Sequence, residues 1–146
     1  MQQGLYPEAM QAHLGNLVTP DQPAESPLSA PSFFNFDLAG VGLGFHHFDD
    51  PELSARRLAD RLAPGGVLFI LDFLPHGEHE AGLLRSHHGV AHHGFSEERI
   101  RAMFEAAGAG GDFGFRVLEK EMVSQNAHGE GHHLVRKMFI ARGTKA

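Results

Sequence analysis

The stretch FDLAGVGLGFHHFDDPELSARRLADRLAPGGVLFILDF, residues 36–73, decides the fold class. It opens with a short apolar run over 36–43, as expected for a strand that is buried on both faces. It closes with 67–73, where aromatic and β-branched residues bounded by turn residues predict a second strand. A helix predicted over 51–63 joins them. A strand, helix, strand unit of this length is typical of a crossover between parallel neighbours, which places the chain in the α/β class.

The limits of that helix are marked by local signals. Asp50 precedes Pro51, so an N-cap residue is followed by proline at the first helical position. Leucines then recur at helical spacing, which predicts one apolar face. The triplet Pro64-Gly65-Gly66 stops the helix.

The second half of the sequence predicts one more helix and two more strands. Ser96 caps a helix that begins with two glutamates and ends at the glycine-rich residues 108–111. Strands are predicted at 113–122 and 134–141, and they pair antiparallel because no long helix lies between them. Before this helix, the His- and Gly-rich stretch after Leu74 predicts a loop with one short helix at 80–86.

Composition excludes several classes of protein. The chain has 146 residues, 12 Lys+Arg, 18 Asp+Glu, 12 His and no Cys, which suits a single domain without disulfides, thiolate metal ligands or a Cys nucleophile. The acidic balance disfavours nucleic acid as a partner, and no apolar run approaches the ~20 residues of a membrane helix. No signal-peptide pattern is present. A cytoplasmic protein with a small-molecule or protein partner is therefore expected.

A glycine pattern after the first strand mimics a dinucleotide-binding fingerprint. Gly40, Gly42 and Gly44 alternate, and Asp72 lies at the end of the next strand. In that fingerprint the third glycine opens the helix whose N-terminus meets the phosphate. Here the predicted helix begins only at Pro51, so we discount this interpretation.

The same residues resemble a different family. Phe36-Asp37 opens the strand, His46-His47-Phe48 follows it, Asp50-Pro51 starts the helix, and Pro64-Gly65-Gly66 precedes the next strand. Together they resemble the fourth strand, following helix and fifth strand of class I S-adenosylmethionine-dependent methyltransferases, in particular small-molecule methyltransferases, including fungal ones. The segment VAHHGFSEERIRAMFEAAG resembles the lid and helix that follow, and FRVLEKEM and RKMFIARG resemble the last two, antiparallel strands.

The resemblance implies a partial Rossmann-like sheet in one truncated domain over 1–146. Residues 1–17 then resemble the third strand and its turn, 18–35 form a Pro-rich connector, and 36–146 supply the C-terminal half of the fold. The implied cofactor is S-adenosyl-L-methionine. The cofactor-binding positions that the resemblance implies are Asn16, Leu17, Gly42, Leu43 and Gly44.

The sequence departs from the family at its start. The family opens with a strand ending in a glycine-rich turn that holds the donor, and a second strand whose acidic end residue binds the ribose; nothing here matches either. The strand 36–43, central in the family, is then an exposed edge, which is a template for pairing. We expect residues 9–14, a partner chain or a second copy in a homodimer to cover it.

Three histidines are candidate catalytic residues. His46 and His47 follow the first strand, at the carboxyl edge where α/β folds place ligands, and either can accept a proton near neutral pH. His93, in the segment that resembles the lid, would line the same carboxyl edge of the sheet. The alternatives are that His46 is a half-buried structural residue and that His92 and His93 form a turn.

The remaining histidines offer a metal site only by spacing. His76 and His79 have glutamates nearby, and His88 and His92 are four residues apart. Because glycines disfavour a rigid helix there and no H-E-x-x-H pattern occurs, no metal is expected.

Three functions follow from these observations. The first is methyl transfer from S-adenosylmethionine to a small molecule by a chain that is incomplete on its own. The second is a methyltransferase-derived protein that serves as a binding or scaffold partner. The third is an enzyme that uses His46 or His47 for proton transfer or cyclisation.

Overall fold

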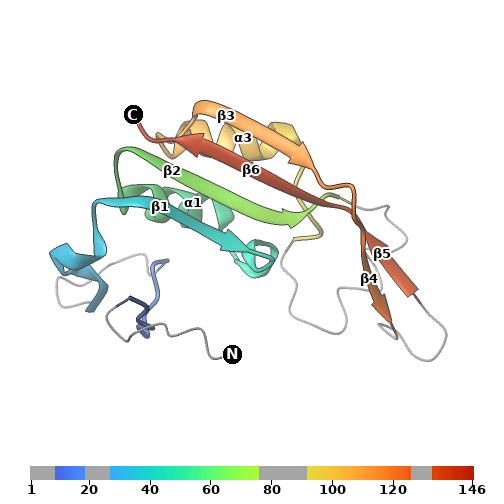
Figure 1. Cartoon of the computed structure of the whole chain (residues 1–146), viewed down its shortest axis with the longest axis horizontal. Helices are drawn as coiled ribbons and strands as arrows, with labels where there is room; N and C mark the ends of the chain where they lie inside the picture. The colour runs from blue at the N-terminus through green and yellow to red at the C-terminus, as the bar shows by residue number, and fades with distance from the viewer. Residues whose placement is uncertain (1–8, 19–26, 76–91, 126–132) are drawn as a thin grey trace.

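The computed structural model describes residues 9–18, 27–75, 92–125 and 133–146. These residues form a four-stranded sheet, a two-stranded ribbon and two α-helices (Figure 1). The helices are α1 (Pro51–Asp60) and α3 (Glu97–Ala106). The strands are β1 (Phe36–Gly42), β2 (Leu62–Phe73), β3 (Gly111–Val117), β4 (Met122–Gln125), β5 (His133–Arg136) and β6 (Met138–Thr144). Short 3-10 turns occupy Pro27–Ser29, Pro31–Phe33 and Phe45–His47.

The four-stranded sheet has the order β1-β2-β6-β3. β1 and β2 run parallel, from Leu38 opposite Val67 to Gly42 opposite Leu71. β6 runs antiparallel to both of its neighbours, β2 and β3. A parallel pair joined by a helix and continued by an antiparallel pair is the partial sheet that the sequence predicts, so the α/β fold class is confirmed.

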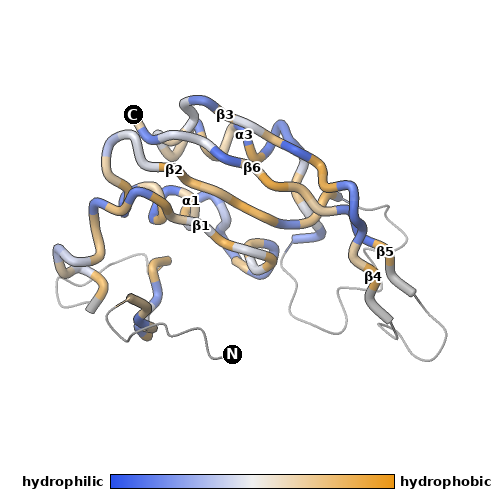
Figure 2. The backbone as a smooth tube through the Cα atoms, in the orientation of Figure 1, coloured by the Kyte–Doolittle hydropathy of each residue, from blue (hydrophilic) through white to orange (hydrophobic). Residues whose placement is uncertain are grey.

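Both helices cover the same face of this sheet (Figure 1). Along β2, Leu68 and Ile70 are fully buried in the core, whereas the alternate residues Val67, Phe69 and Leu71 remain partly exposed on the other face. Figure 2 shows that β2 is hydrophobic along most of its length. One face of the sheet therefore carries the core, and the other is apolar without a helix over it in the described part of the chain.

The core lies between the sheet and the two helices. Its buried members are Phe45, Ala55, Ala59, Leu62, Leu68, Ile70, Phe95, Ile100, Met103, Phe104, Ala109, Phe139 and Ala141. The predicted apolar face of the second helix is confirmed, since Ile100, Met103 and Phe104 all belong to this cluster. Burial of these side chains is the main stabilising term of the fold.

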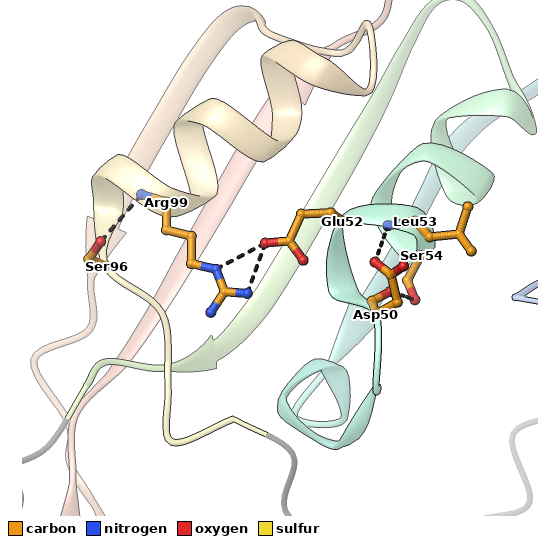
Figure 3. Close-up of polar contacts among 6 residues, drawn as sticks. All are labelled: Asp50, Glu52, Leu53, Ser54, Ser96 and Arg99. Atoms are coloured by element: carbon orange, nitrogen blue, oxygen red, sulfur yellow. Dashed lines mark hydrogen bonds and ion pairs between the residues drawn. The ribbon is translucent and has the colours of Figure 1, made fainter.

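The caps predicted for both helices are present (Figure 3). The Asp50 carboxylate accepts from the Leu53 N–H at 2.8 Å, and the Ser96 hydroxyl accepts from the Arg99 N–H at 3.3 Å. Arg99 also reaches Glu52 of α1, with Nη2 2.8 Å from Oε1. Because both partners of this ion pair are about half exposed, the caps fix the helix starts more strongly than the bridge joins the helices.

Several predicted boundaries differ from the structure. The helix predicted to reach residue 63 ends at Asp60, and β2 begins at Leu62 rather than at residue 67. The reason is that Gly65, at φ 82°, and Gly66 pair with the C-terminal end of the chain: Gly65 N–H donates to Lys145 O, and Lys145 N–H donates to Gly66 O. The turn residues are thereby drawn into the strand.

The strands predicted at 113–122 and 134–141 are each divided. β3 ends at Val117, and β4 is a separate strand paired with β5 in the ribbon. A break at Lys137 separates β5 from β6, because the carbonyl of Lys137 accepts from the N–H of Leu74 beyond the end of β2. The sheet therefore gives way to a ribbon that extends away from it (Figure 1).

The strand-like role expected for the N-terminal segment is not seen. The described residues 9–18 contain no strand, and Leu14 is 97% exposed. Gly15 instead approaches Leu28, which is buried in the first 3-10 turn of the Pro-rich connector. The pairing of 9–14 with β1 is thus a wrong prediction, and the short helix predicted at 80–86 lies outside the described residues.

Gly40 and Gly42 of β1 make a matched test of this packing. A Cβ on Gly40 would lie 2.4 Å from the Phe69 ring and from the Phe69 carbonyl oxygen, whereas a Cβ on Gly42 meets nothing within 4 Å. We expect Gly40→Ala to lower the free energy of unfolding by about 1–3 kcal/mol, because backbone must shift, and Gly42→Ala to change it by less than about 0.5 kcal/mol. Urea unfolding measures both, and equal losses would contradict the packing.

Asp49 and Asp50 make a second matched pair. Asp50→Ala removes the cap of α1 and is expected to cost about 1 kcal/mol of unfolding free energy. Asp49→Ala, at an exposed neighbour that caps nothing, is expected to cost less than half as much. Thermal unfolding followed by circular dichroism measures the difference, and a larger loss for Asp49→Ala would refute the role of Asp50.

Candidate functional site

The candidate site lies at the carboxyl ends of β1 and β2, where the turn Phe45–His47 follows β1. Asp72, near the end of β2, is fully buried, and His46 is 4% exposed. His46 Nδ1 lies 2.7 Å from Asp72 Oδ1. The structure therefore joins a predicted histidine to a carboxylate 26 positions further along the chain.

Asp72 accepts three hydrogen bonds. Oδ1 accepts from His46 Nδ1 and from the main-chain N–H of Phe73 at 2.8 Å, and Oδ2 accepts from the main-chain N–H of His46 at 3.1 Å. Because a carboxylate only accepts, the bond assigns the ring proton of neutral His46 to Nδ1. Nε2 is left as the basic nitrogen, and no hydrogen bond within the described residues reaches it.

Two aromatic rings border His46. The His47 ring centroid lies 4.1 Å from that of His46, and the Phe73 ring centroid lies 5.3 Å away. Arg136 of the ribbon places its guanidinium carbon 3.7 Å from the centre of the Phe73 ring. Phe73 thus stands between the imidazole and a buried cation.

His47, unlike His46, is exposed and lines a cleft of about 400 Å³. The other lining residues are Asn16, Val18, Phe48, Asp49, Asp50 and Leu53. The cleft therefore combines an aromatic wall with an amide and two carboxylates. His46 lies behind His47, so only the second histidine faces this space directly.

The residues expected to bind the cofactor fall into two groups. Asn16 lines the His47 cleft, and together with Leu17 it also lines a smaller neighbouring cleft of about 230 Å³. Gly42, Leu43 and Gly44 lie at the end of β1, outside both clefts. Asn16 and Leu17 thus lie in or next to the His47 cleft. Gly42, Leu43 and Gly44 belong to the stretch of chain that leads from β1 to His46.

Leu43 has an unusual backbone. Its φ of 55° is left-handed, which is uncommon for a residue with a side chain, and its N–H donates to Leu71 O at 2.8 Å. This conformation turns the chain out of β1 and into the turn that carries His46. The glycine pattern is not a phosphate cradle here, because the 3-10 turn Phe45–His47 separates it from α1.

The segment before α3 reaches the same edge. His92 N–H donates to His46 O at 3.0 Å, and Phe95 N–H donates to Phe73 O at 2.9 Å. His93, the third candidate catalytic residue, is half-buried between these two anchors. The segment that resembles the lid therefore lies next to His46, as predicted, and the contact between them is a main-chain hydrogen bond from His92.

The sequence analysis gave no role at this edge to Asp72, Phe73 or Arg136, and Asp72 entered it only as part of the discounted glycine fingerprint. Asp72 had one usable signal, since it is the single charge within the apolar run 67–73. Such a charge is almost never buried without a partner. Phe73 and Arg136 carried no comparable signal, because their positions depend on how the ribbon leaves the sheet.

The described residues contain neither a cluster of metal-ligating side chains nor a membrane-spanning helix. No group of three His, Cys, Asp or Glu side chains there is arranged to hold a metal ion. His76, His79 and His88 lie outside the described residues. None of the described helices has the length and apolar character needed to cross a membrane.

Comparisons with solved structures define the class of fold. A methyltransferase-type protein from Bacillus halodurans aligns over 80% of this chain and 73% of its own, with 14% identity and a TM-score of 0.57. An S-adenosylmethionine-dependent methyltransferase from Thermotoga maritima aligns over 77% and 57%, with 20% identity and a TM-score of 0.52. A phosphoethanolamine N-methyltransferase from Haemonchus contortus aligns over 75% and 33%, with 13% identity and a TM-score of 0.55.

The chain is therefore structurally similar to class I S-adenosylmethionine-dependent methyltransferases over most of its length. At these identities the similarity establishes the fold alone. No protein-family model matches the sequence, and no curated protein matches it. The chain spans about a third to three quarters of the structures that it resembles.

Asp72→Asn tests the His46–Asp72 pair. The amide places an NH₂ group where one of the two carboxylate oxygens accepted a hydrogen bond, so a donor meets a donor and the free energy of unfolding is expected to fall by about 1–3 kcal/mol. Long-range ¹H–¹⁵N spectra of the imidazoles are expected to show the Nδ1–H form of His46 in the parent chain and its loss in the variant. Asp37→Asn, at an exposed residue of β1, is the control and is expected to change neither measurement.

Proposed function

We propose that this protein is a methyltransferase-like enzyme that acts on a small molecule with S-adenosylmethionine as donor, and that the chain by itself supplies only part of the donor site. The observation that carries the proposal is the pairing of His46 with buried Asp72 beside the cleft lined by His47. Ligands of α/β folds bind at this carboxyl edge. The fold alone would not support an activity.

The residues of the cleft fit the donor in part. Phe48 offers an apolar surface for an adenine ring, and Asp49 and Asp50 offer negative charge to a sulfonium. The Oδ1 atom of Asn16 accepts from Val18 N–H at 2.9 Å, which orients this side chain at the wall of the cleft. No glycine-rich turn resembling that of the family occurs in the described residues, so the chain offers only part of the family's contacts to the donor, and we expect it to bind the donor more weakly than a complete site would.

The bound donor would supply the methyl group, and the chain's own residues would orient the acceptor and accept its proton. His47 is the imidazole that faces the cleft, so it is the group placed to contact an acceptor. His46, held by Asp72, packs against the His47 ring and fixes its position. Because methyl transfer needs chiefly orientation, with modest help from a base, this division of roles suits the reaction.

A second function is favoured by the same pair. The His46–Asp72 bond forms entirely within residues that the structure describes and requires no donor. A methyltransferase-derived protein that has lost methyl transfer would retain it, either as an enzyme of His-dependent proton transfer or cyclisation, or as part of a binding or scaffold protein. These alternatives predict that the donor does not bind.

Calorimetric titration of the purified chain with S-adenosylmethionine and S-adenosylhomocysteine separates the functions. We expect both to bind with a Kd below about 100 μM, equivalent to about −5.5 kcal/mol. Asp49→Asn is expected to weaken the binding of S-adenosylmethionine at least about threefold and to weaken the binding of S-adenosylhomocysteine less. The reason is that only S-adenosylmethionine carries the positive charge of a sulfonium. Asp60→Asn, on the exposed side of α1, is the control.

Absence of heat with both compounds at a protein concentration of about 100 μM would exclude donor binding by this chain. The second function would then stand. Equal effects of Asp49→Asn on both compounds would show that the cleft is not where the sulfonium lies.

A further inference from the structure

The amino ends of β1 and β2 hold a buried arginine that the candidate functional site does not use. Arg61 lies between α1 and β2, and its main-chain O accepts from the N–H of Phe36 at 3.0 Å, which ties it to the start of β1. The residue is only 7% exposed. Arginine is almost never enclosed to this extent unless its charge is paired, so the surroundings of the guanidinium are informative.

The guanidinium of Arg61 is matched by neighbours on one edge and one face. Nη1 donates to the main-chain O of Leu28, and the centre of the Phe34 ring lies 4.2 Å from the guanidinium carbon. Nε is enclosed without an acceptor, and no hydrogen bond from Nη2 is seen within the described residues. Nε and Nη2 form the edge of a guanidinium that holds a carboxylate through two parallel hydrogen bonds. In the described part of the chain, this edge of Arg61 has no acceptor.

The charge of Arg61 is compensated only in part. No described carboxylate forms an ion pair with it, and the neighbouring Asp60 is exposed and reaches Arg57 instead, with Oδ2 4.0 Å from Nη1. Burial lowers the pKa of Arg61; to smaller extents, Asp60 raises it and Arg57 lowers it further. Arg61 is also the C-cap residue of α1, where the helix dipole supplies a partial negative charge. A full negative charge at the Nε–Nη2 edge would stabilise this cation further.

Arg61 lines a cavity of about 410 Å³ beside β1. Small-molecule pockets have volumes of roughly 300–1,000 Å³, so the cavity is large enough for a ligand. Most of its wall is made by the apolar side chains of Leu17, Leu28, Phe33, Phe36, Leu38 and Leu58. The second polar side chain among its lining residues is His13, whose Nε2 lies 3.1 Å from Gln11 Oε1. The cavity thus combines one incompletely matched cation with an apolar surface.

We propose that this cavity binds a small monocarboxylate with an apolar body, such as an arylalkanoate. The carboxylate accepts from Nε and Nη2 of Arg61, and the apolar body lies against the leucines and phenylalanines of the wall. One negative charge matches the one cation. The second charge of a phosphate dianion would have no partner in so apolar a cavity, which favours a carboxylate.

A neutral occupant would leave the charge of Arg61 unmatched. Residues 13–17 and the 3-10 turns lie across the cavity from β1, and a strand paired with β1 would bring only neutral main-chain groups to it. The cavity lies toward the amino ends of the parallel strands, whereas His46 and Asp72 lie at their carboxyl ends. The carboxylate site needs no methyl donor, so its failure would leave the proposed function unaffected.

Calorimetric titration of the whole chain with phenylbutyrate at neutral pH tests the site. We expect a Kd below about 0.5 mM, and we expect the matched neutral amide, phenylbutyramide, to bind at least about tenfold more weakly. Phenyl phosphate, mostly a dianion at neutral pH, is expected to bind at least about threefold more weakly than phenylbutyrate. Arg61→Gln is expected to raise the Kd of phenylbutyrate at least about tenfold. Arg56→Gln, at an exposed residue of α1 outside the cavity, is the control and is expected to leave this Kd unchanged.

The Nε–H resonance of Arg61 supplies a second readout that needs no variant. In ¹H–¹⁵N spectra of the parent chain, assigned through the side-chain carbons, phenylbutyrate is expected to shift this resonance because Nε gains an acceptor. Phenylbutyramide that binds as tightly as phenylbutyrate, or an Arg61→Gln chain with unchanged affinity, would overturn the proposal. An unshifted Nε–H resonance at about 5 mM phenylbutyrate, roughly ten times the expected Kd, would overturn it equally.

Discussion

The carboxyl edge of the sheet depends on one buried anion. Asp72 is fully enclosed, and an enclosed carboxylate is tolerated only when its oxygens are matched by donors. Its donors are the ring of His46, the main chain of His46 and the main chain of Phe73. They come from the turn after β1 and from the last residue of β2, so the charge holds the end of β2 to that turn. The position of His47 in the cleft follows from that attachment.

The sequence predicted the elements whose signals are local. Asp50 and Ser96 are N-cap residues that mark the first residues of their helices, and both caps form as expected. The predicted ends of strands were less accurate because they depend on distant partners: β2 is lengthened by Lys145, and β6 is separated from β5 at Lys137. The N-terminal segment resembled a strand in its residues alone, but a strand forms only where a neighbour accepts its hydrogen bonds, and within residues 9–18 none does.

The site was predictable to the same extent. Ligands of α/β folds bind at the carboxyl ends of parallel strands, and this rule predicts a site at the residues after β1. It selects His46 and His47 but does not distinguish their surroundings. The structure distinguishes them, since one histidine is enclosed against Asp72 and the other faces the cleft. No local pattern contains that difference, because it arises from a contact between a turn and a strand that lie 26 residues apart in the sequence. Asn16 lies beside His47 for a reason equally remote in sequence, the folding back of the N-terminal segment.

The stack of Arg136 on Phe73 gives the ribbon of β4 and β5 a mechanical role. Arg136 is the last residue of β5, and its guanidinium rests on the ring that borders His46. Tilting the ribbon away from the sheet would pull this cation from Phe73 and free one face of the ring. A force applied at the far end of the ribbon would thus be transmitted, through a single aromatic side chain, to the imidazole at the carboxyl edge.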